Sequence, residues 1–438
     1  MRDARVIFGV LVVYILSVYG SMAVMSVGSG VVFAAWIFLF ARPRVFAGEV
    51  AGWTRSPLWR PTLVLSLACV WSLAWARISG LEFFGARPEI RWIEDTRKLW
   101  HIFFPFVLSS FLMRLSDEDF RKALWLWLGA GAALACFGIL QYYVPIYKSQ
   151  YLPHVTYDTY VRGSGALDFL RGRYHATGLT GFHLSFASIF GFPTGVWFAL
   201  AALRWREEGW TQRTRWLAAG AILFFITNIL TYSKTTWVAL PLLVLGVAFV
   251  AMKGRIRYIL TAVMIVFAAV GMQTSEFRLR FQGTDTIKER LEVWSANLEM
   301  LKQHPLFGVG WHHNSDLSEA YYKARGMHGF VSHAHNNFLD QLASTGAFGL
   351  AGFVWWNFIV IAAAYRLFRR GGVVSPSADS ETRLLYRALG LGFFGGWFLL
   401  HLSGMTQTNF WDAKVLHQIG LVAAFTCEAW RRTSAKRT

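Results

Sequence analysis

Cysteine and acidic side chains are what this sequence has little of. The chain of 438 residues contains three cysteines and 25 acidic residues. Each cysteine, Cys69, Cys136 or Cys427, lies inside an apolar run, and their spacing matches no metal-binding pattern. We therefore expect inert core thiols. The first apolar run begins at Val6 without a small-residue cleavage pattern, so we expect a retained helix there.

Several signatures of soluble enzymes are also missing. The sequence has no Gly-x-Ser-x-Gly elbow and no reactive cysteine, which weighs against acyl-enzyme chemistry. The glycines between residues 163 and 181 lack the preceding strand and the Gly-Lys-Ser/Thr ending of a nucleotide-binding loop. No internal repeat stands out, although transporters often contain repeats. A transporter nevertheless stays open as a less favoured alternative.

Apolar side chains are present in excess. Hydrophobic residues make up 55% of the chain and aromatic residues 17%, in repeated runs long enough to cross a bilayer. We predict an all-α integral membrane protein in which residues 1–438 form a single polytopic domain with about twelve transmembrane helices. These helices are expected near residues 6–22, 25–41, 61–76, 99–113, 122–144, 179–203, 216–232, 235–252, 257–272, 346–365, 386–403 and 413–430.

The basic residues predict the orientation in the membrane. The net charge of +18 is read as an orientation signal rather than as nucleic-acid binding. Short loops rich in Arg and Lys are expected in the cytoplasm, together with both termini. Three long connections, residues 77–98, 145–178 and 273–345, are expected outside, although they too carry many cations. These cations either contact headgroups and nearby acidic side chains or form a shared site for a phosphate-bearing ligand.

Candidate anion ligands occur in two outer segments. Arg162 and Arg173 lie in the Arg- and Gly-rich loop 145–178, where glycines would let backbone N–H groups approach an anion. The alternative is a loop with glycine turns and no ligand. Lys234 lies at a helix end in TYSKTTWV and would either reach the same anion or extend toward the membrane interface.

The third long connection begins with an amphipathic helix that Pro305 ends. Arg290 precedes the apolar Leu291 by one residue, so it is expected about 100° away from the buried stripe and facing a cavity. That predicted stripe consists of Ile287, Leu291, Trp294, Leu298 and Leu301.

Histidines are concentrated in the same connection. Three interpretations are open: a zinc site, a general base, or loop histidines bonded to the backbone. The spacing does not fit His-Glu-x-x-His, and no Cys or Glu ligand set is nearby, which disfavours zinc. For a general base, His335 is our first candidate, with His333 as the second and Asn336 in support. The five histidines are His312, His313, His328, His333 and His335.

Four motifs in this region resemble a known family. They are RLEVW, HPLFGVG, HAHN and GAFGL, in that order. Together they are similar to the shared core of the O-antigen ligase and O-antigen polymerase superfamily. In that family His-Asn, His-Ser or His-Gln is followed after nine residues by Gly-x-x-Gly. Here His335 and Asn336 are followed by nine residues and then by Gly346 and Gly349.

One further element departs from the family pattern. The segment SKTTWV looks like the family's Arg-x-x-x-Leu element, but it has Lys234 in place of Arg and Val238 in place of Leu. The positive charge is kept and the bidentate fork is lost.

The resemblance implies a GT-C-type glycosyltransferase of the bacterial inner membrane, with residues 273–345 as a large, partly helical periplasmic catalytic loop. Such an enzyme would transfer a glycan from undecaprenyl diphosphate to a hydroxyl of lipid A–core, with inversion and without a metal ion or other cofactor. Arg290, Lys234, Arg162 and Arg173 would bind the diphosphate, and His335 would act as the base. The sister polymerase, whose acceptor is a lipid-linked glycan, is the main alternative.

Overall fold

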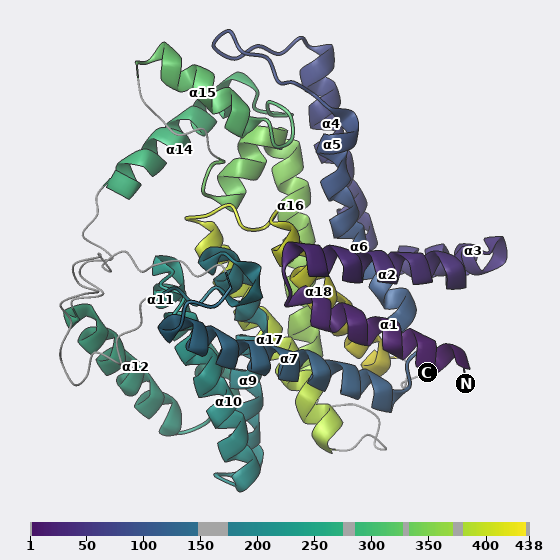
Figure 1. The fold of residues 1–438 in the computed structure, drawn as a ribbon, viewed down its shortest axis with the longest axis vertical. Helices are drawn as coiled ribbons and strands as arrows, with labels where there is room; N and C mark the ends of the chain where they lie inside the picture. The colour runs from purple at the N-terminus through teal and green to yellow at the C-terminus, as the bar shows by residue number, and fades with distance from the viewer. Residues whose placement is uncertain (1, 148–173, 275–284, 327–332, 371–379, 435–438) are drawn as a thin grey trace.

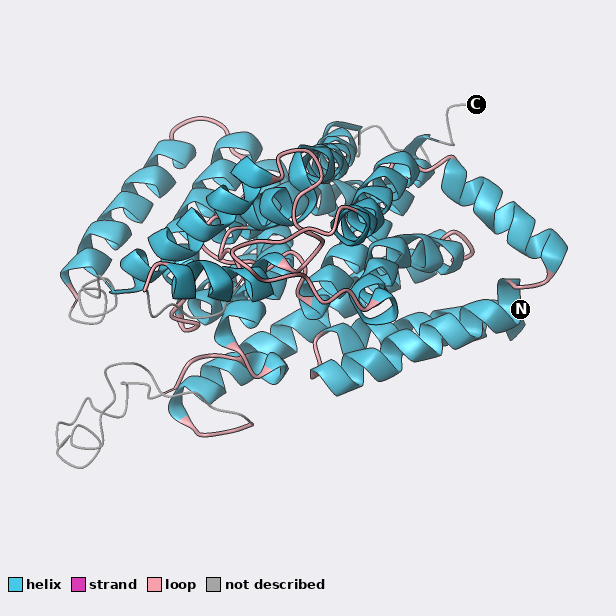
Figure 2. Ribbon diagram, turned by 90° about the horizontal axis from the view of Figure 1, so that it is seen from above, coloured by secondary structure: helices cyan, strands magenta, loops and turns pink. Residues whose placement is uncertain are grey.

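The computed structural model describes residues 2–147, 174–274, 285–326, 333–370 and 380–434. In this part of the chain the structure is helical, apart from one isolated bridge between Phe83 and Ala86 (Figures 1 and 2). The elements are α1 (Arg2–Val18), α2 (Met22–Phe40), α3 (Pro43–Thr54), α4 (Trp59–Ile78), α5 (Trp92–Thr96), η1 (Arg97–Leu99), α6 (Trp100–Leu112), α7 (Asp117–Tyr143), η3 (Gly178–Thr180), α9 (His183–Glu208), α10 (Gln212–Ile229), α11 (Lys234–Ala251), α12 (Ile256–Gln273), α14 (Asp285–Gln303), α15 (Asn314–Ala324), α16 (Asn337–Arg370), α17 (Ser380–Gly404) and α18 (Ala413–Ser434).

The expected all-α class is confirmed, and each predicted span overlaps an observed helix. Seven helices of the described chain are long and apolar enough to cross a membrane: α2, α4, α7, α9, α11, α12 and α16. The shorter apolar stretch Ala4–Val18 lies in α1. A multi-pass membrane protein is therefore supported, while the count of twelve spans stays a prediction.

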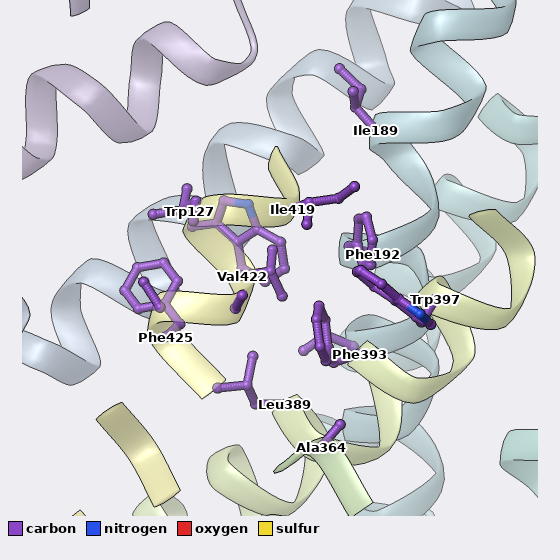
Figure 3. Packing of buried hydrophobic residues seen from close by; sticks show 14 of the residues in the cluster. Trp127, Ile189, Phe192, Ala364, Leu389, Phe393, Trp397, Ile419, Val422 and Phe425 are labelled. Atoms are coloured by element: carbon purple, nitrogen blue, oxygen red, sulfur yellow. The ribbon is translucent and has the colours of Figure 1, made fainter. Parts of the chain in front are cut away.

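Close contact between α9 and α17 builds the centre of the bundle. A Cβ atom on Gly195 of α9 would lie 2.2 Å from the carbonyl oxygen of Gly392 on α17, so only glycine allows the two backbones to meet there. Large aromatic side chains such as Trp127, Phe393 and Trp397 fill the adjoining core (Figure 3). This core anchors the helices whose ends carry the polar site.

A second, smaller core joins α14 and α15 to α16 and to the connection after α4 (Figure 1). It corrects the predicted orientation of α14. Leu291 is 54% exposed and Leu298 is 46% exposed, whereas Val293 and Met300 are buried. Arg290 lies one turn before Val293 and is half-buried, so it belongs to the packed side of the helix. The spacing of apolar residues alone predicted the wrong buried face of α14. The face that is buried includes the polar Asn297, which is completely buried and which such a spacing does not count.

The cysteine prediction holds in part. Cys69 is buried and Cys427 is partly buried, but Cys136 is exposed on α7, so the core-thiol prediction is wrong for Cys136. A helix that is apolar on every side also has an outward face, and hydropathy does not tell which residues lie on it.

Candidate active site

A backbone pairing between two distant segments shapes the site. Residues 305–310 run alongside residues 343–348 through four hydrogen bonds. Gly346 has φ 66° and ψ −168°, which interrupts α16. A Cβ atom on Gly346 would lie 2.3 Å from the carbonyl carbon of Leu306, so the close approach requires glycine. The bonds are Val309 N to Ala343 O (3.1 Å), Gly310 N to Ser344 O (3.0 Å), Ala347 N to Pro305 O (2.9 Å) and Phe348 N to Leu306 O (3.2 Å).

The turn that carries the two central histidines is held at Ala334, which lies between them. Trp294 Nε1 on α14 donates to the carbonyl oxygen of Ala334 at 2.9 Å, and the Ala334 N–H donates to Asp340 Oδ1 at 3.3 Å. Asp340 Oδ1 also accepts from Asn314 Nδ2 at 3.0 Å, and that amide donates to Asn297 Oδ1 at 2.8 Å. Helices α14, α15 and α16 therefore fix this turn together.

His335 is placed as an unprotonated imidazole. Its backbone is left-handed, with φ 49°, and its ring centroid lies 4.4 Å from that of His333. Burial lowers the pKa of His335 to about 4, and the charges of His333 and Arg290 contribute to the same shift. At neutral pH the ring therefore carries no charge and has a nitrogen able to accept a proton.

Arg290 has the burial and the lack of partners within the described residues that are expected of a cation that binds a ligand. It is half-buried, and burial lowers the pKa of its guanidinium. Within the described residues it takes part in no hydrogen bond or ion pair. A guanidinium that is partly desolvated and unpaired favours an anionic ligand with oxygen acceptors.

Asn336 has a structural role in the turn. Its Oδ1 accepts from the N–H groups of Phe338 (2.9 Å) and Leu339 (3.0 Å), which caps α16. Its Nδ2 donates to the carbonyl oxygen of Met405 at 3.3 Å. Asn336 thus supports the backbone that carries His335 and ties it to the turn after α17.

The helix that begins at Lys234 contacts the turn after α17 through Thr235. Lys234 is the first residue of α11 and is half-buried. The adjacent Thr235 has its Oγ1 2.7 Å from Thr406 Oγ1, and Thr406 follows Met405, the partner of Asn336. The structure therefore brings the residues that adjoin Lys234 and His335 in sequence to the same turn, residues 405–406.

Two of the predicted ligands, Arg162 and Arg173, lie outside the described residues, as does His328. The described chain resumes at Tyr174, and the N–H of Ala176 donates to the carbonyl oxygen of Leu230 at 2.9 Å. This contact lies four residues before Lys234. The roles proposed for Arg162 and Arg173 stay predictions.

The other outer cations differ in burial and in pairing. Several form exposed ion pairs, which supports the simple salt-bridge interpretation for them. These pairs are Arg87–Glu82 (3.1 Å), Arg91–Glu89 (3.0 Å), Lys302–Glu299 (3.4 Å) and Lys323–Glu319 (2.6 Å). In contrast, Lys98 is half-buried and, like Arg290, has no hydrogen bond or ion pair within the described residues.

Sequence reasoning did not select Lys98, Asp340, Trp294 or Asn314 as functional residues. The one signal for Asp340 was an acid in the first turn of an apolar helix, five residues after His335. Nothing local distinguished Lys98 from its exposed neighbours. Among the described residues, no group of three His, Cys, Asp or Glu side chains is placed to share a metal ion.

Comparisons with known proteins agree with the motifs. Residues 219–354 match the family described as O-antigen ligase, a span that includes Lys234, Arg290 and His335. The exopolysaccharide production protein ExoQ of Rhizobium meliloti (strain 1021) is 29% identical over 325 residues, with 61% of this chain and 72% of the relative covered. These matches confirm the resemblance to the ligase and polymerase superfamily. They support an O-antigen ligase- or polymerase-type function in a membrane.

Proposed function

We propose that this protein is an O-antigen ligase, a glycosyltransferase of the bacterial inner membrane. It moves a glycan from undecaprenyl diphosphate to a hydroxyl of lipid A–core at the periplasmic face, and both of its termini are cytoplasmic. The observation that carries the proposal is that Arg290, which has no hydrogen bond or ion pair within the described residues, lies on the helix that Trp294 bonds to the turn of the neutral His335. Together they supply a cation for a diphosphate and a base for a hydroxyl.

In the proposed reaction, His335 takes the proton from the acceptor hydroxyl as its oxygen attacks the anomeric carbon of the donor. The bond between that carbon and the diphosphate oxygen breaks, and the diphosphate leaves with the electron pair. Arg290 and Lys234 stabilise the charge that develops on the diphosphate, with Arg162 and Arg173 as further ligands. Direct attack from the face opposite the diphosphate inverts the anomeric centre.

The charge of Arg290 also affects the pKa of the base His335. In the free protein it helps to lower the pKa of His335 to about 4, which leaves a weak base. A bound diphosphate would offset the positive charge of Arg290 and add negative charge nearby, so the pKa of His335 would rise toward neutrality. A general base works best when its pKa lies near the ambient pH. His335 therefore becomes effective when the donor is in place.

The name of the relative supports a second candidate. Because ExoQ is an exopolysaccharide production protein, the acceptor here would be another lipid-linked glycan if the two proteins share a substrate class. The base, the cations and the leaving group would then act in the same way. Only the acceptor side of the site would differ.

Deleting the gene in the native host distinguishes these candidates. Loss of all long lipopolysaccharide chains, with polymerised lipid-linked glycan retained, is the result expected for a ligase. Lipopolysaccharide capped by a single repeat indicates a polymerase instead. Unchanged lipopolysaccharide and unchanged exopolysaccharide would overturn both.

A further inference from the structure

Helix α3 lies at the edge of the bundle, between two helices that are long and apolar enough to cross a membrane (Figure 1). Residues 41–42 connect α2 to α3, and residues 55–58 connect α3 to α4. Each residue of an extended chain spans at most about 3.6 Å. Connections this short therefore keep α3 at the surface of the bilayer that α2 and α4 would cross.

The inner face of α3 is fixed to the end of α6. Glu49 is 5% exposed and forms an ion pair with Arg114, which lies just after α6. One turn later, Trp53 Nε1 donates to Ser110 Oγ of α6 at 3.2 Å. Glu49 and Trp53 are four residues apart and share a face of the helix. These two contacts set the rotation of α3 about its axis, so the opposite face is turned outward.

The outward face of α3 has an arginine at each end. Arg44, Gly48, Ala51 and Arg55 follow one another at steps of four, three and four residues, which places them on one stripe of the helix. All four are exposed. Roughly 16 Å of helix axis separates the two arginines, at 1.5 Å per residue. The small residues between them leave the surface of the helix open to a ligand.

Four exposed arginines surround α3, and within the described residues none of their side chains takes part in a hydrogen bond or an ion pair. The one acidic residue between positions 41 and 60 is Glu49, which already pairs with Arg114. Guanidinium groups without carboxylate partners favour anionic oxygens, above all those of phosphate. The four arginines are Arg42, Arg44, Arg55 and Arg60.

Apolar side chains beside these arginines favour a lipid over a soluble anion. Phe46 of α3 is 42% exposed, and Ile37 and Phe38 near the end of α2 are 47% and 83% exposed. A phospholipid offers a phosphate to the arginines and acyl chains to the apolar surface, whereas inorganic phosphate offers only the first. A headgroup with a net negative charge fits best, because a zwitterionic headgroup brings a cation of its own toward the arginines.

We propose that the outward face of α3 binds anionic phospholipids at the membrane surface. This inference goes beyond the proposed function and does not depend on it, since no residue of the candidate active site takes part. The partner is a phospholipid with a net negative headgroup. A lipid that binds only the folded protein stabilises it, so the bound phospholipid should raise the temperature of unfolding.

The test is thermal unfolding of the full-length purified protein in a nonionic detergent, titrated with phosphatidylglycerol or with phosphatidylcholine. Phosphatidylglycerol should raise Tm at a much lower concentration than phosphatidylcholine does. Arg44→Gln combined with Arg55→Gln should raise the half-stabilising concentration of phosphatidylglycerol roughly 25-fold, because each basic residue near an anionic surface contributes about fivefold. The matched control is Lys122→Gln combined with Arg213→Gln, which removes the same charge from two ion-paired side chains and should behave like the parent.

The other outcomes count against the proposal. A parent-like half-stabilising concentration for the Arg44 and Arg55 double variant refutes the site, as does equal stabilisation by the two lipids. Stabilisation by inorganic phosphate at the concentration that suffices for phosphatidylglycerol indicates a free-anion site and overturns the lipid assignment. Salt should weaken the preference for phosphatidylglycerol, because exposed charges are screened, and a preference that salt leaves unchanged contradicts the arginine contacts.

A second double variant keeps the test decisive if the first does not fold. Arg42→Gln combined with Arg60→Gln alters the two arginines that flank the helix and leaves the outward stripe intact. It too should raise the half-stabilising concentration of phosphatidylglycerol by an order of magnitude or more. The parent value in this variant would refute the proposed lipid surface.

Discussion

Trp294 Nε1 donates a hydrogen bond of 2.9 Å to the carbonyl oxygen of Ala334. Trp294 lies one helical turn after Arg290 on α14, and Ala334 directly precedes His335. This bond therefore connects the helix that carries the candidate cation to the turn that carries the candidate base. The two groups belong to separate segments, and their relative position depends on such contacts.

Trp294→Phe should lower kcat roughly three- to tenfold without unfolding the protein. The substitution keeps the aromatic ring and removes one hydrogen bond, which is typically worth about 1 kcal/mol. Ser295→Ala, on the exposed side of the same helix, is the control and should behave like the parent. A Trp294→Phe protein with the parent kcat would mean that this bond does not align the site.

His335→Ala should reduce transfer by about a hundred- to ten-thousand-fold while the protein remains inserted and folded. The measurement is transfer by purified protein, with thermal unfolding followed in parallel. His333→Ala should have a smaller effect, because His333 is exposed and acts on His335 from beside it. If His333→Ala is the more damaging substitution, the base must be reassigned to His333.

Arg290→Lys should impair turnover although the charge is kept, because a bidentate fork is replaced by a point charge. Arg290→Ala should cost more, on the order of 3 kcal/mol in the barrier, as when a donor to a developing charge is removed. The control is Arg87→Ala, which breaks an exposed ion pair with Glu82. The rate is measured at saturating donor, and equal turnover by Arg290→Ala and the parent would refute the anion site.

The pH dependence should differ between the free and the donor-bound protein. Because a base must be unprotonated, activity is lost as the pH falls through the pKa of His335. In kcat/KM this acid limb should lie near pH 4, the pKa in the free protein, rather than near 6.5. In kcat it should lie at higher pH, because the bound diphosphate raises that pKa. Arg290→Gln should move the free-protein limb upward, and an unmoved limb would show that Arg290 does not act on His335.

Gly346→Ala should destabilise the protein by about 1–3 kcal/mol or prevent folding, because an alanine there is strained at positive φ and meets the backbone of Leu306. Gly246→Ala on α11 is the control, since a Cβ atom at Gly246 would meet nothing within 4 Å. Thermal unfolding in detergent measures both. Equal melting temperatures for the two variants would argue against the tight pairing of residues 305–310 with 343–348.

The sequence by itself determined the helical membrane class, the approximate positions of the helices and the resemblance to a family. These properties are local: a run of apolar residues, a proline that ends a helix, or a glycine spacing is complete within a short stretch. Gly346 is an example, since its spacing from His335 was visible before its contact with Leu306 was known. The pairing of its neighbours with the segment after Pro305 explains why that spacing matters.

The tertiary structure alone decided which faces are inside and which distant groups meet. The apolar period of α14 placed Leu291 in the core, but packing around the buried pair Asn297 and Asn314 turned that residue outward. The contact between His313 and Asp95, 218 residues apart, holds the segment after α4 against the start of α15. Within the described residues, partial burial without a hydrogen bond or ion pair distinguishes Lys98 and Arg290 from the cations that form exposed ion pairs. Burial and pairing are properties of the assembled molecule, because they depend on the groups that surround each side chain after folding.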